Sequence, residues 1–307
     1  MFFSHGGVPW YALQKCLEAP HVDSISIRNS PWTCVLPPPS SARIPSDARL
    51  VKFVYGVSLW RGVQGQIYPR DMQAAYELES TYLQIIVPSM AGHAEELVLP
   101  VETAPLERMA ALRWPHLHTL SLHSTQLQPS LHDILPDVLV QMPELRSLSV
   151  LLTPPDQPPR TRLLKDASKG QWCRNLRSLT VSYPNPTDAM FASLTHRLTH
   201  LSLRDTPRYY MYDRYGDFYC HTERPLLTSS ACLEILRSTT LAQVTALEVV
   251  YLADSDEDDL LHHIVSACPL LEDVELHRYR ESDDEDIPYV RASTHLVPMR
   301  PSFISSF

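Results

Sequence analysis

Histidines are the residues of this sequence best suited to chemistry, because an imidazole can bind a metal ion or transfer a proton near neutral pH. The chain has 14 histidines, and two of them, His262 and His263, are adjacent. Neighbouring residues of a helix point to different sides, so this pair cannot share one ion. The chain also lacks an H-E-x-x-H motif, in which two histidines one helical turn apart bind zinc. We therefore predict no metal site.

Motifs for nucleophilic catalysis and for nucleotide binding are missing as well. The sequence contains no G-x-S-x-G, no G-x-x-x-x-G-K-[ST] and no G-x-G-x-x-G motif. Glycine is scarce, with 8 residues, which disfavours the glycine-rich loops that bind phosphates. We predict that the chain is not an enzyme and binds no cofactor. A hydrolase is the remotest of the functions that we consider.

Two acidic runs could attract a cation. Asp254–Asp259 reads D-S-D-E-D-D, and Glu281–Asp286 reads E-S-D-D-E-D. The first run resembles the start of a calcium-binding loop but lacks the central glycine and the distant glutamate of that motif. We interpret it instead as the charged start of a helix. Ser255 and Ser282 each precede acidic residues, so their phosphorylation is a hypothesis.

The densest group of aromatic residues lies in Pro207–Pro225, where tyrosines alternate with arginines and aspartates. Tyrosine and arginine are enriched at protein interfaces, because each buries a large area and keeps a polar end. Alternatively, this loop folds back on the protein itself, or it stacks on RNA bases. The candidate partner-binding residues of the segment are Tyr209, Tyr210, Tyr212, Arg214, Tyr215 and Phe218.

Copies of one short repeat form the elements that must position these residues. The clearest copy, Leu117–Thr125, reads L-x-x-L-x-L-x-x-T, and its alternation predicts a strand with one buried face. Six of the eight steps between successive copies are 22 to 31 residues long, near the leucine-rich-repeat period. The central apolar residues of the nine copies are Ile25, Phe53, Leu97, Leu120, Leu148, Leu179, Leu201, Leu247 and Val274.

Stacking of these copies predicts the fold. One strand with its return segment cannot bury its leucines, whereas stacked copies share a continuous core. We predict an α/β leucine-rich-repeat solenoid, which is curved, with a parallel sheet on the concave face and helices and loops on the convex face. Residues 1–280 form this domain, and residues 281–307 form an acidic, flexible tail. The predicted helices are Trp10–Leu17, Arg70–Ile86, Arg108–Leu112, Pro129–Val140, Leu226–Ser238 and Asp258–Cys268.

Residues that flank the buried leucines should face outward on the concave side of the sheet. On the middle strands most of them carry small hydroxyl groups, and on the last strands they turn acidic. This pattern indicates a polar docking surface, although small residues also suit a crowded parallel sheet. The candidate partner-binding residues on this face are Thr119, Ser121, His123, Ser149, Thr180, Ser202 and Arg204.

Composition narrows the classes of partner. The formal net charge is −9, which disfavours nucleic acids and anionic membranes as partners. No apolar run reaches the length of a membrane-spanning helix, and no signal-peptide core follows Met1. The six cysteines include no C-x-x-C pair. We therefore expect reduced thiols in a monomeric protein of the cytoplasm or nucleus.

Three segments of the sequence resemble the irregular leucine-rich repeats of F-box proteins, particularly those of fungi. They are Trp114–Leu120, Trp172–Leu179 and Ala267–Leu276, and the resemblance extends over about Trp10 to Tyr279. It implies a substrate-receptor subunit of a cullin-RING ubiquitin ligase. In such a subunit the F-box binds a Skp1-type adaptor, and the repeats hold the protein that is ubiquitinated.

The F-box itself is absent from the sequence. An F-box opens with an L-P-x-E-[ILV] pattern, and the nearest match, Leu135–Leu139, lies inside a predicted return helix. The repeats also begin near residue 10 without the cap that terminal repeats need, so we expect a piece of a longer gene product. We predict a protein-interaction module that is the substrate-recognition part of an F-box-like receptor, with Skp1-type adaptor binding only if an F-box lies upstream. The alternative is an interaction scaffold unrelated to ubiquitination.

Overall fold

Parallel strands form one continuous sheet along the chain. The structure is a computed structural model that describes residues 10–28, 44, 49–56, 69–124, 131–152, 162–164, 174–206 and 226–279. The sheet runs in the order β1-β2-β3-β4-β5-β6-β7-β9-β10, and β8 pairs with β9. The strands are β1 (Ser24–Arg28), β2 (Lys52–Gly56), β3 (Glu96–Pro100), β4 (Thr119–Ser124), β5 (Ser147–Leu152), β6 (Ser178–Ser182), β7 (His200–Arg204), β8 (Leu227–Thr228), β9 (Ala246–Leu252) and β10 (Asp273–Tyr279).

All nine predicted repeat strands are confirmed. The central apolar residue of each copy pairs with the central residue of the next copy, as Leu120 does with Leu148 and Leu148 with Leu179. The same register holds from Ile25 at one edge of the sheet to Val274 at the other. A slip of one residue would turn every leucine of a strand toward solvent, so the buried face determines this register.

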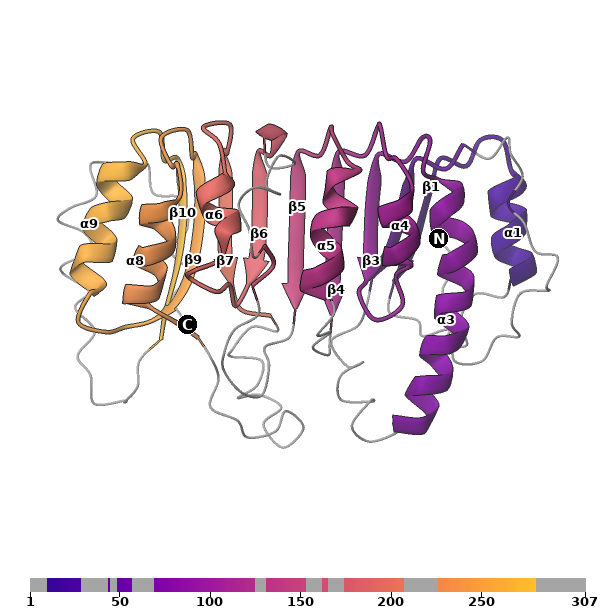
Figure 1. Cartoon of the computed structure of the whole chain (residues 1–307), viewed down its shortest axis with the longest axis horizontal. Helices are drawn as coiled ribbons and strands as arrows, with labels where there is room; N and C mark the ends of the chain where they lie inside the picture. Colours follow the sequence, from indigo (N-terminus) through magenta and orange to yellow (C-terminus); the bar gives the residue numbers. More distant parts are fainter. Residues whose placement is uncertain are drawn as a thin grey trace.

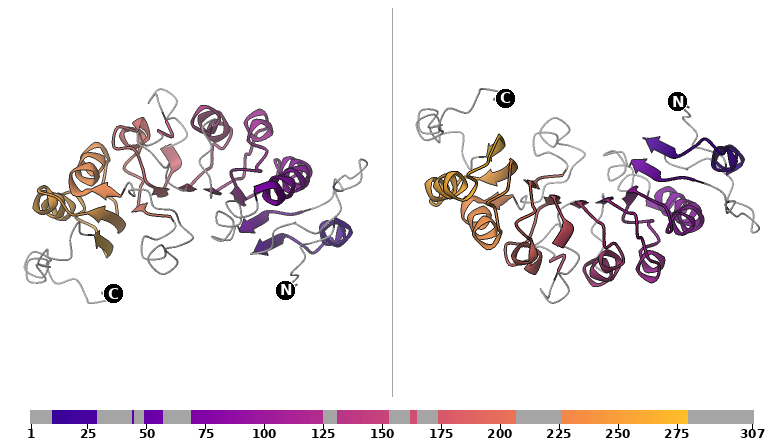
Figure 2. Two further views of the ribbon diagram at one scale, coloured as in Figure 1. Left: turned by 90° about the horizontal axis from the view of Figure 1, so that it is seen from below. Right: turned by 90° about the horizontal axis from the view of Figure 1, so that it is seen from above.

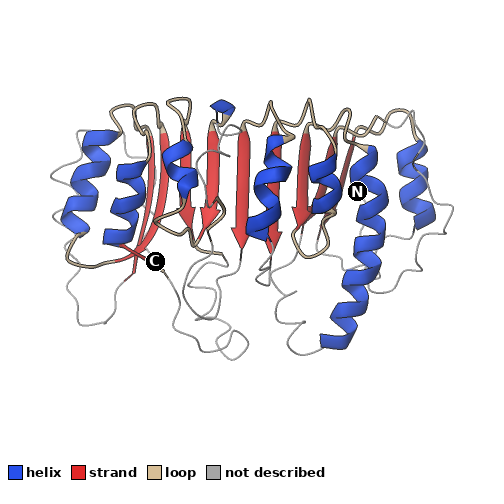
Figure 3. Ribbon diagram, in the orientation of Figure 1, coloured by secondary structure: helices blue, strands red, loops and turns tan. Residues whose placement is uncertain are grey.

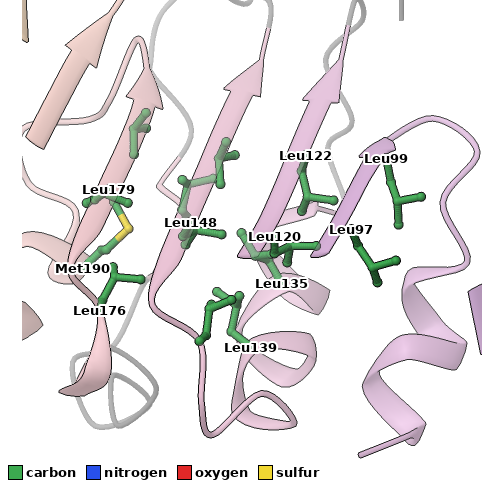
Figure 4. Packing of buried hydrophobic residues seen from close by; sticks show 14 of the residues in the cluster. Leu97, Leu99, Leu120, Leu122, Leu135, Leu139, Leu148, Leu176, Leu179 and Met190 are labelled. Atoms are coloured by element: carbon green, nitrogen blue, oxygen red, sulfur yellow. The ribbon is translucent and has the colours of Figure 1, made fainter. Parts of the chain in front are cut away.

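The core lies between the sheet and the helices. Leu120 and Leu122 of β4 are fully buried, as are the equivalent residues of neighbouring strands (Figure 4). Helix residues such as Leu135 and Leu139 close the core from the other side. Each fully buried leucine contributes about 1.5–3 kcal/mol of transfer free energy. This one apolar cluster extends from Trp10 to Cys268, so the repeats share a single core.

Helices connect most of the strands and cover one face of the sheet (Figures 1 and 3). Figure 2 shows the strands on the inner side of an arc and the helices on its outer side, so the uncovered face of the sheet is concave. The predicted fold class is thus confirmed in the described part of the chain. The helices are α1 (Trp10–Glu18), α3 (Pro69–Ser89), α4 (Leu106–Ala111), α5 (Leu131–Val140), α6 (Ala189–Ser193), α8 (Ser229–Ser238) and α9 (Glu257–Ala267).

One helix prediction needs correction, and one helix was not predicted. The predicted helix over Leu226–Ser238 begins only at Ser229, because Leu227 and Thr228 form β8 against β9. The Thr228 hydroxyl accepts a hydrogen bond from the Ala231 amide and so caps the helix. Helix α6 was not predicted, because its five residues are too few to show a helical period.

Buried carboxylates form hydrogen bonds that hold the connecting segments against the sheet and against each other. Glu79 of α3 is buried, and it accepts hydrogen bonds from the hydroxyls of Tyr55 on β2 (2.7 Å) and Thr103 after β3. Asp188, also buried, accepts from the amides of Leu163 (2.5 Å) and Met190 (2.9 Å). Burial raises the pKa of Asp188 even though backbone amides donate to it. The contacts of Asp188 hold the segment 162–164 against the start of α6.

Candidate functional site

The concave face is built by three rows of outward side chains that cross the strands. Register places Ser121 beside Ser149, Ser149 beside Thr180, and Thr180 beside Ser202. The same row continues to Glu248 on β9. Parallel neighbouring strands lie about 4.8 Å apart, so the side chains of one row form a continuous line across the face.

A group of six hydroxyl residues, here called the hydroxyl grid, occupies the middle of the concave face on β4, β5 and β6. Each of these side chains is half-buried. No hydrogen bond joins any of the six hydroxyls to another group within the described ranges, so they are available to a ligand. The hydroxyl grid consists of Thr119, Ser121, Ser147, Ser149, Ser178 and Thr180.

Two other outward hydroxyl groups form hydrogen bonds within the protein itself. Ser202, which the sequence places among the candidate partner-binding residues, is only 1% exposed and donates a hydrogen bond to Glu248. Ser182 donates to the carbonyl of Leu152 at 2.7 Å, at the end of the neighbouring strand. Ser202 lies beside Glu248 of the next strand in register. It can therefore position Glu248 but cannot form a contact surface.

Carboxylates gather on the concave face at β9 and β10. Register places Glu248 directly opposite Glu275, and oxygens of both carboxylates lie within 4.8 Å of each other and of a nitrogen of His277. Glu248 is 9% exposed, whereas the side chain of Glu275 is 56% exposed. The guanidinium of Arg204 lies 3.9 Å from Glu248, and His277 contacts Glu275. The carboxylates of Glu248, Asp273 and Glu275 are here called the acidic end.

The alternation within the strands predicts that Glu248 and Glu275 point outward. Neither residue is among the site residues that the sequence predicts. Their opposition arises from register between strands 27 residues apart in the chain. Two carboxylates and one imidazole are also a possible ligand set for a divalent ion, although exposed acidic groups commonly occur without one. The absence of a metal site therefore stays a prediction of the sequence.

Of the other predicted residues on this face, His123 and Arg204 are half-buried at the carboxyl ends of β4 and β7. They do not meet, because β5 and β6 separate their strands. The six predicted residues of the aromatic segment Pro207–Pro225 lie outside the described residues, and Thr206 and Leu226 are the described residues on its two sides.

A small apolar cluster lies near the carboxyl ends of β6 and β9. It contains Tyr183, Leu226 and Val250, with Leu252 and Tyr279 packed against it. Tyr183 has a φ angle of 45°, in the left-handed region that bulky residues rarely adopt. The amide of Tyr183 donates to the carbonyl of Arg204, which ties this turn to the next strand. The cluster thus stabilises the part of the sheet that lies beside the acidic end.

Behind the acidic end, a partly buried polar network joins β9, β10 and α9. Arg278 donates to Glu257 at 2.7 Å, and the hydroxyl of Tyr251 donates to the same carboxylate at 3.0 Å. Burial and the nearby charge of Glu257 raise the pKa of Tyr251, so the phenol stays protonated. Burial also raises the pKa of Cys268 to about 11, which keeps its thiol protonated and unreactive. Neither group is suited to nucleophilic chemistry.

Comparisons with known proteins add little to this description. No family model matches the chain, and no curated protein matches its sequence. Among solved structures, it is similar to the leucine-rich-repeat-containing protein LegL7 from Legionella pneumophila, with 12% identity over 84% of this chain and 83% of that chain and a TM-score of 0.39. At this similarity, the fold assignment rests on the strands and helices of the chain itself. No helix among the described residues is long and apolar enough to cross a membrane.

Proposed function

We propose that the chain is a protein-interaction module whose concave face holds an extended segment of a partner protein. The hydroxyl grid is the observation that supports this proposal. Its hydroxyls are half-buried and have no hydrogen-bond partner among the described residues. A hydroxyl can donate and accept, so it suits both the amides and the carbonyls of a polypeptide. Small side chains also allow a backbone to approach the sheet closely.

The rigidity of the surface supports binding as well. The hydroxyl grid belongs to strands that have neighbours on both sides, and the leucines between the hydroxyls are fully buried. A site held on such strands loses little conformational freedom when a partner binds. Thr119, Ser121, Ser149 and Thr180 are the contact residues of this proposal, with His123 and Arg204 at its margins.

We propose the aromatic segment Pro207–Pro225 as a second contact, on the strength of its composition. Replacement of Tyr209, Tyr210 and Tyr212 by serine should weaken capture of a partner at least about tenfold, the loss expected when an aromatic interface anchor is removed. Undiminished capture by a folded triple variant would exclude these tyrosines as contacts.

Photo-cross-linking can test the concave face directly. A benzoylphenylalanine at Ser149 should yield a discrete adduct with a partner protein in a lysate of the source organism. The same group at Glu234, which is exposed on the outer helix α8, should not yield that adduct. Equal yield of the same adduct from both positions would contradict docking on the concave face.

A double substitution, Ser149→Arg with Thr180→Arg, provides a second test. The long side chains should fill the surface over β5 and β6 and reduce capture of the cross-linked protein at least about tenfold. The control Glu107→Arg with Glu234→Arg changes two exposed residues of the outer helices and should leave capture unchanged. Thermal unfolding of both variants checks that they fold. Full capture by the concave-face variant would overturn the proposal.

The finer proposal is that the module recognises substrates for an F-box-like ubiquitin-ligase receptor. It is supported by the resemblance of Trp114–Leu120, Trp172–Leu179 and Ala267–Leu276 to F-box-protein repeats. The genomic sequence upstream of Met1 should then encode an F-box, and a chain extended by it should bind a Skp1-type adaptor. Failure of the extended chain to bind the adaptor would leave an interaction scaffold unrelated to ubiquitination.

We also propose that residues 1–280 form the repeat domain and residues 281–307 a flexible tail, in a monomeric protein of the cytoplasm or nucleus. The last repeat strand ends at Tyr279, and the acidic run Glu281–Asp286 follows it in the sequence. Limited proteolysis should cut within residues 281–307 before it cuts the repeats.

A further inference from the structure

Exposed arginines gather at the edge of the sheet where the strands begin. The connections that enter β4, β5, β6 and β7 lie along this edge, which is uppermost in Figure 1. Their described parts, residues 112–118, 141–146, 174–177 and 194–199, contain five arginines and one acidic residue, Glu144. With histidine counted as neutral, their net formal charge is +4, in a chain whose net charge is −9. The five exposed arginines, here called the basic edge, are Arg113, Arg146, Arg174, Arg177 and Arg197.

Backbone hydrogen bonds hold these connections side by side. The amide of Arg146 donates to the carbonyl of His118 at 2.9 Å, and the amide of Arg177 donates to the carbonyl of Arg146 at 2.7 Å. The amide of Thr199 continues the row by donating to the carbonyl of Arg177 at 2.8 Å. Neighbouring parallel strands lie about 4.8 Å apart, so Arg146 and Arg177 project from adjacent backbone positions. The sheet fixes these positions before any ligand arrives.

No guanidinium of the basic edge forms an ion pair with a carboxylate among the described residues. Within the same ranges, one side-chain hydrogen bond is made by the set, from Arg197 to the amide oxygen of Asn175 at 2.9 Å. Arg146 lies six residues beyond Val140, where α5 ends, whereas a helix dipole favours cations only within its last turn. Helix stabilisation therefore does not account for Arg146. Like charges repel, so an anionic group over the basic edge would relieve this repulsion.

Carboxylates lie beyond both ends of the positive row. On one side, the amide of His118 donates to the carbonyl of Glu95 at 2.9 Å. On the other side, Thr199 is followed in the ladder by Thr245 and then by Glu272. Both glutamates are exposed. The three spacings from His118 to Thr199 measure about 14 Å, which an extended chain covers with about four residues. A longer polyanion would meet Glu95 or Glu272, so the row suits a short anionic segment.

We propose that the basic edge binds a short run of aspartates and glutamates in a partner protein. This surface is separate from the concave face and does not depend on the docking proposed there. A guanidinium has five N–H donors and can bind both oxygens of one carboxylate. A single-stranded nucleic acid suits the edge less well, because its bases stack on exposed aromatic side chains. The one aromatic residue in the described parts of these connections, Trp114, is fully buried.

Fluorescence anisotropy with a labelled decapeptide, in which glycine and serine flank four glutamates, tests the proposal at an ionic strength of about 0.15 M. We expect this peptide to bind the full chain, and a matched peptide with glutamine in place of glutamate to bind at least about tenfold more weakly. The variant Arg146→Gln with Arg177→Gln should lose at least about tenfold in affinity for the glutamate peptide. Absence of binding by the glutamate peptide would overturn the proposal.

The matched control is Arg108→Gln with Arg237→Gln, which removes two exposed arginines from the outer helices α4 and α8. It changes the net charge by the same amount, and its affinity should stay within about twofold of that of the unmodified chain. Equal losses in both glutamine variants would show only general electrostatic attraction, contrary to the proposal.

A charge-preserving variant, Arg146→Lys with Arg177→Lys, separates a loss of charge from damage to the fold. Its affinity for the glutamate peptide should stay within about fivefold of that of the unmodified chain, because a lysine keeps the positive charge but not the planar group. A loss as large as that of the Arg146→Gln, Arg177→Gln variant would contradict a site that recognises carboxylates by charge.

Competition distinguishes an acidic protein segment from other anionic partners. A five-nucleotide single-stranded RNA has four phosphodiester groups and so matches the charge of the glutamate peptide. The unlabelled glutamate peptide should displace the labelled one at a lower concentration than this RNA does. Displacement by the RNA at the lower concentration would assign the basic edge to nucleic acid and would overturn the proposal. Displacement by phosphatidylserine vesicles, lost in the Arg146→Gln, Arg177→Gln variant, would overturn it in favour of a membrane surface.

Discussion

Single polar residues connect neighbouring repeats, and Asp254 is the clearest example. It lies at the start of the acidic run that precedes α9, and its carboxylate accepts hydrogen bonds from the amide (3.0 Å) and the hydroxyl (2.7 Å) of Ser230 in α8. It also accepts from the amide of Asp256. The sequence interpretation of this run as helix N-terminal charge is therefore incomplete, because Asp254 caps the helix of the preceding repeat.

The contacts of Asp254 predict a pH-dependent stability. Burial alone would raise the pKa of Asp254, but the hydrogen bonds from Ser230 and Asp256 outweigh it and lower the pKa. A lowered pKa in the folded state means that the charged carboxylate stabilises the fold above its unfolded pKa of about 4, and that this contribution is lost as the pH falls through the folded-state pKa. At pH 7, Asp254→Asn should lower the free energy of unfolding by about 1 kcal/mol.

Urea unfolding at several pH values measures this effect. The difference between the unmodified chain and Asp254→Asn should shrink as the pH falls below about 4, because protonation removes the charge that asparagine lacks. Glu144→Gln, at an exposed turn position, is the control and should show little difference at any pH. A difference for Asp254→Asn that does not change with pH would contradict the role of the ionised carboxylate.

Tyr55 is a second residue with a testable contact. Its hydroxyl donates to the buried carboxylate of Glu79. Tyr55→Phe removes this donor but keeps the buried ring, and we expect it to lower the free energy of unfolding by about 1–3 kcal/mol, because a buried carboxylate loses a hydrogen bond. Chemical denaturation measures the loss. A change below about 0.5 kcal/mol would indicate that another donor replaces the tyrosine.

At the scale of elements, strand and helix meet through leucines at fixed positions of the repeat. Leu148 of β5 is 1% exposed, whereas Val140 of the adjacent helix α5 is 52% exposed. Leu148→Ala should leave a cavity and lower the free energy of unfolding by about 2–5 kcal/mol. Val140→Ala removes apolar atoms that already contact water and should change it by less than about 0.5 kcal/mol. Similar effects from the two substitutions would contradict the assignment of the buried face.

At the scale of the whole molecule, stability should vary along the arc. Strands β4 to β7 have a neighbour on each side, whereas β1 and β10 each have one. Leu276 of β10 is 39% exposed, while Leu122 of β4 is fully buried. Because repeats are stabilised by their neighbours, the end repeats should open more readily than the middle ones.

Hydrogen–deuterium exchange followed by mass spectrometry tests this gradient. Peptides that cover β4, β5 and β6 should exchange at least about tenfold more slowly than peptides that cover β10, in line with the range of local opening energies within one protein. Uniform protection across the sheet would mean that the chain opens as one cooperative unit rather than from its ends.

The sequence predicted the nine repeat strands, their order and the buried face of the sheet. A period of two within each strand and a repeat near 20–29 residues are local signals, and burial of leucines on one face leaves one register that satisfies them all. Helix boundaries were less certain, because caps such as Thr228 and the pairing of Leu227 with β9 depend on residues of other repeats.

The arrangement of the concave face was decided by the tertiary structure. Alternation alone identifies Ser202, Glu248 and Glu275 as outward residues and treats them alike. Only the pairing of β7, β9 and β10 brings Ser202 into a hydrogen bond with Glu248 and places Glu248 opposite Glu275. The physical reason is that solvent exposure and charge repulsion depend on side chains from neighbouring strands. The sequence by itself determined the scaffold of this protein, whereas strand pairing determined which outward groups remain available to a partner.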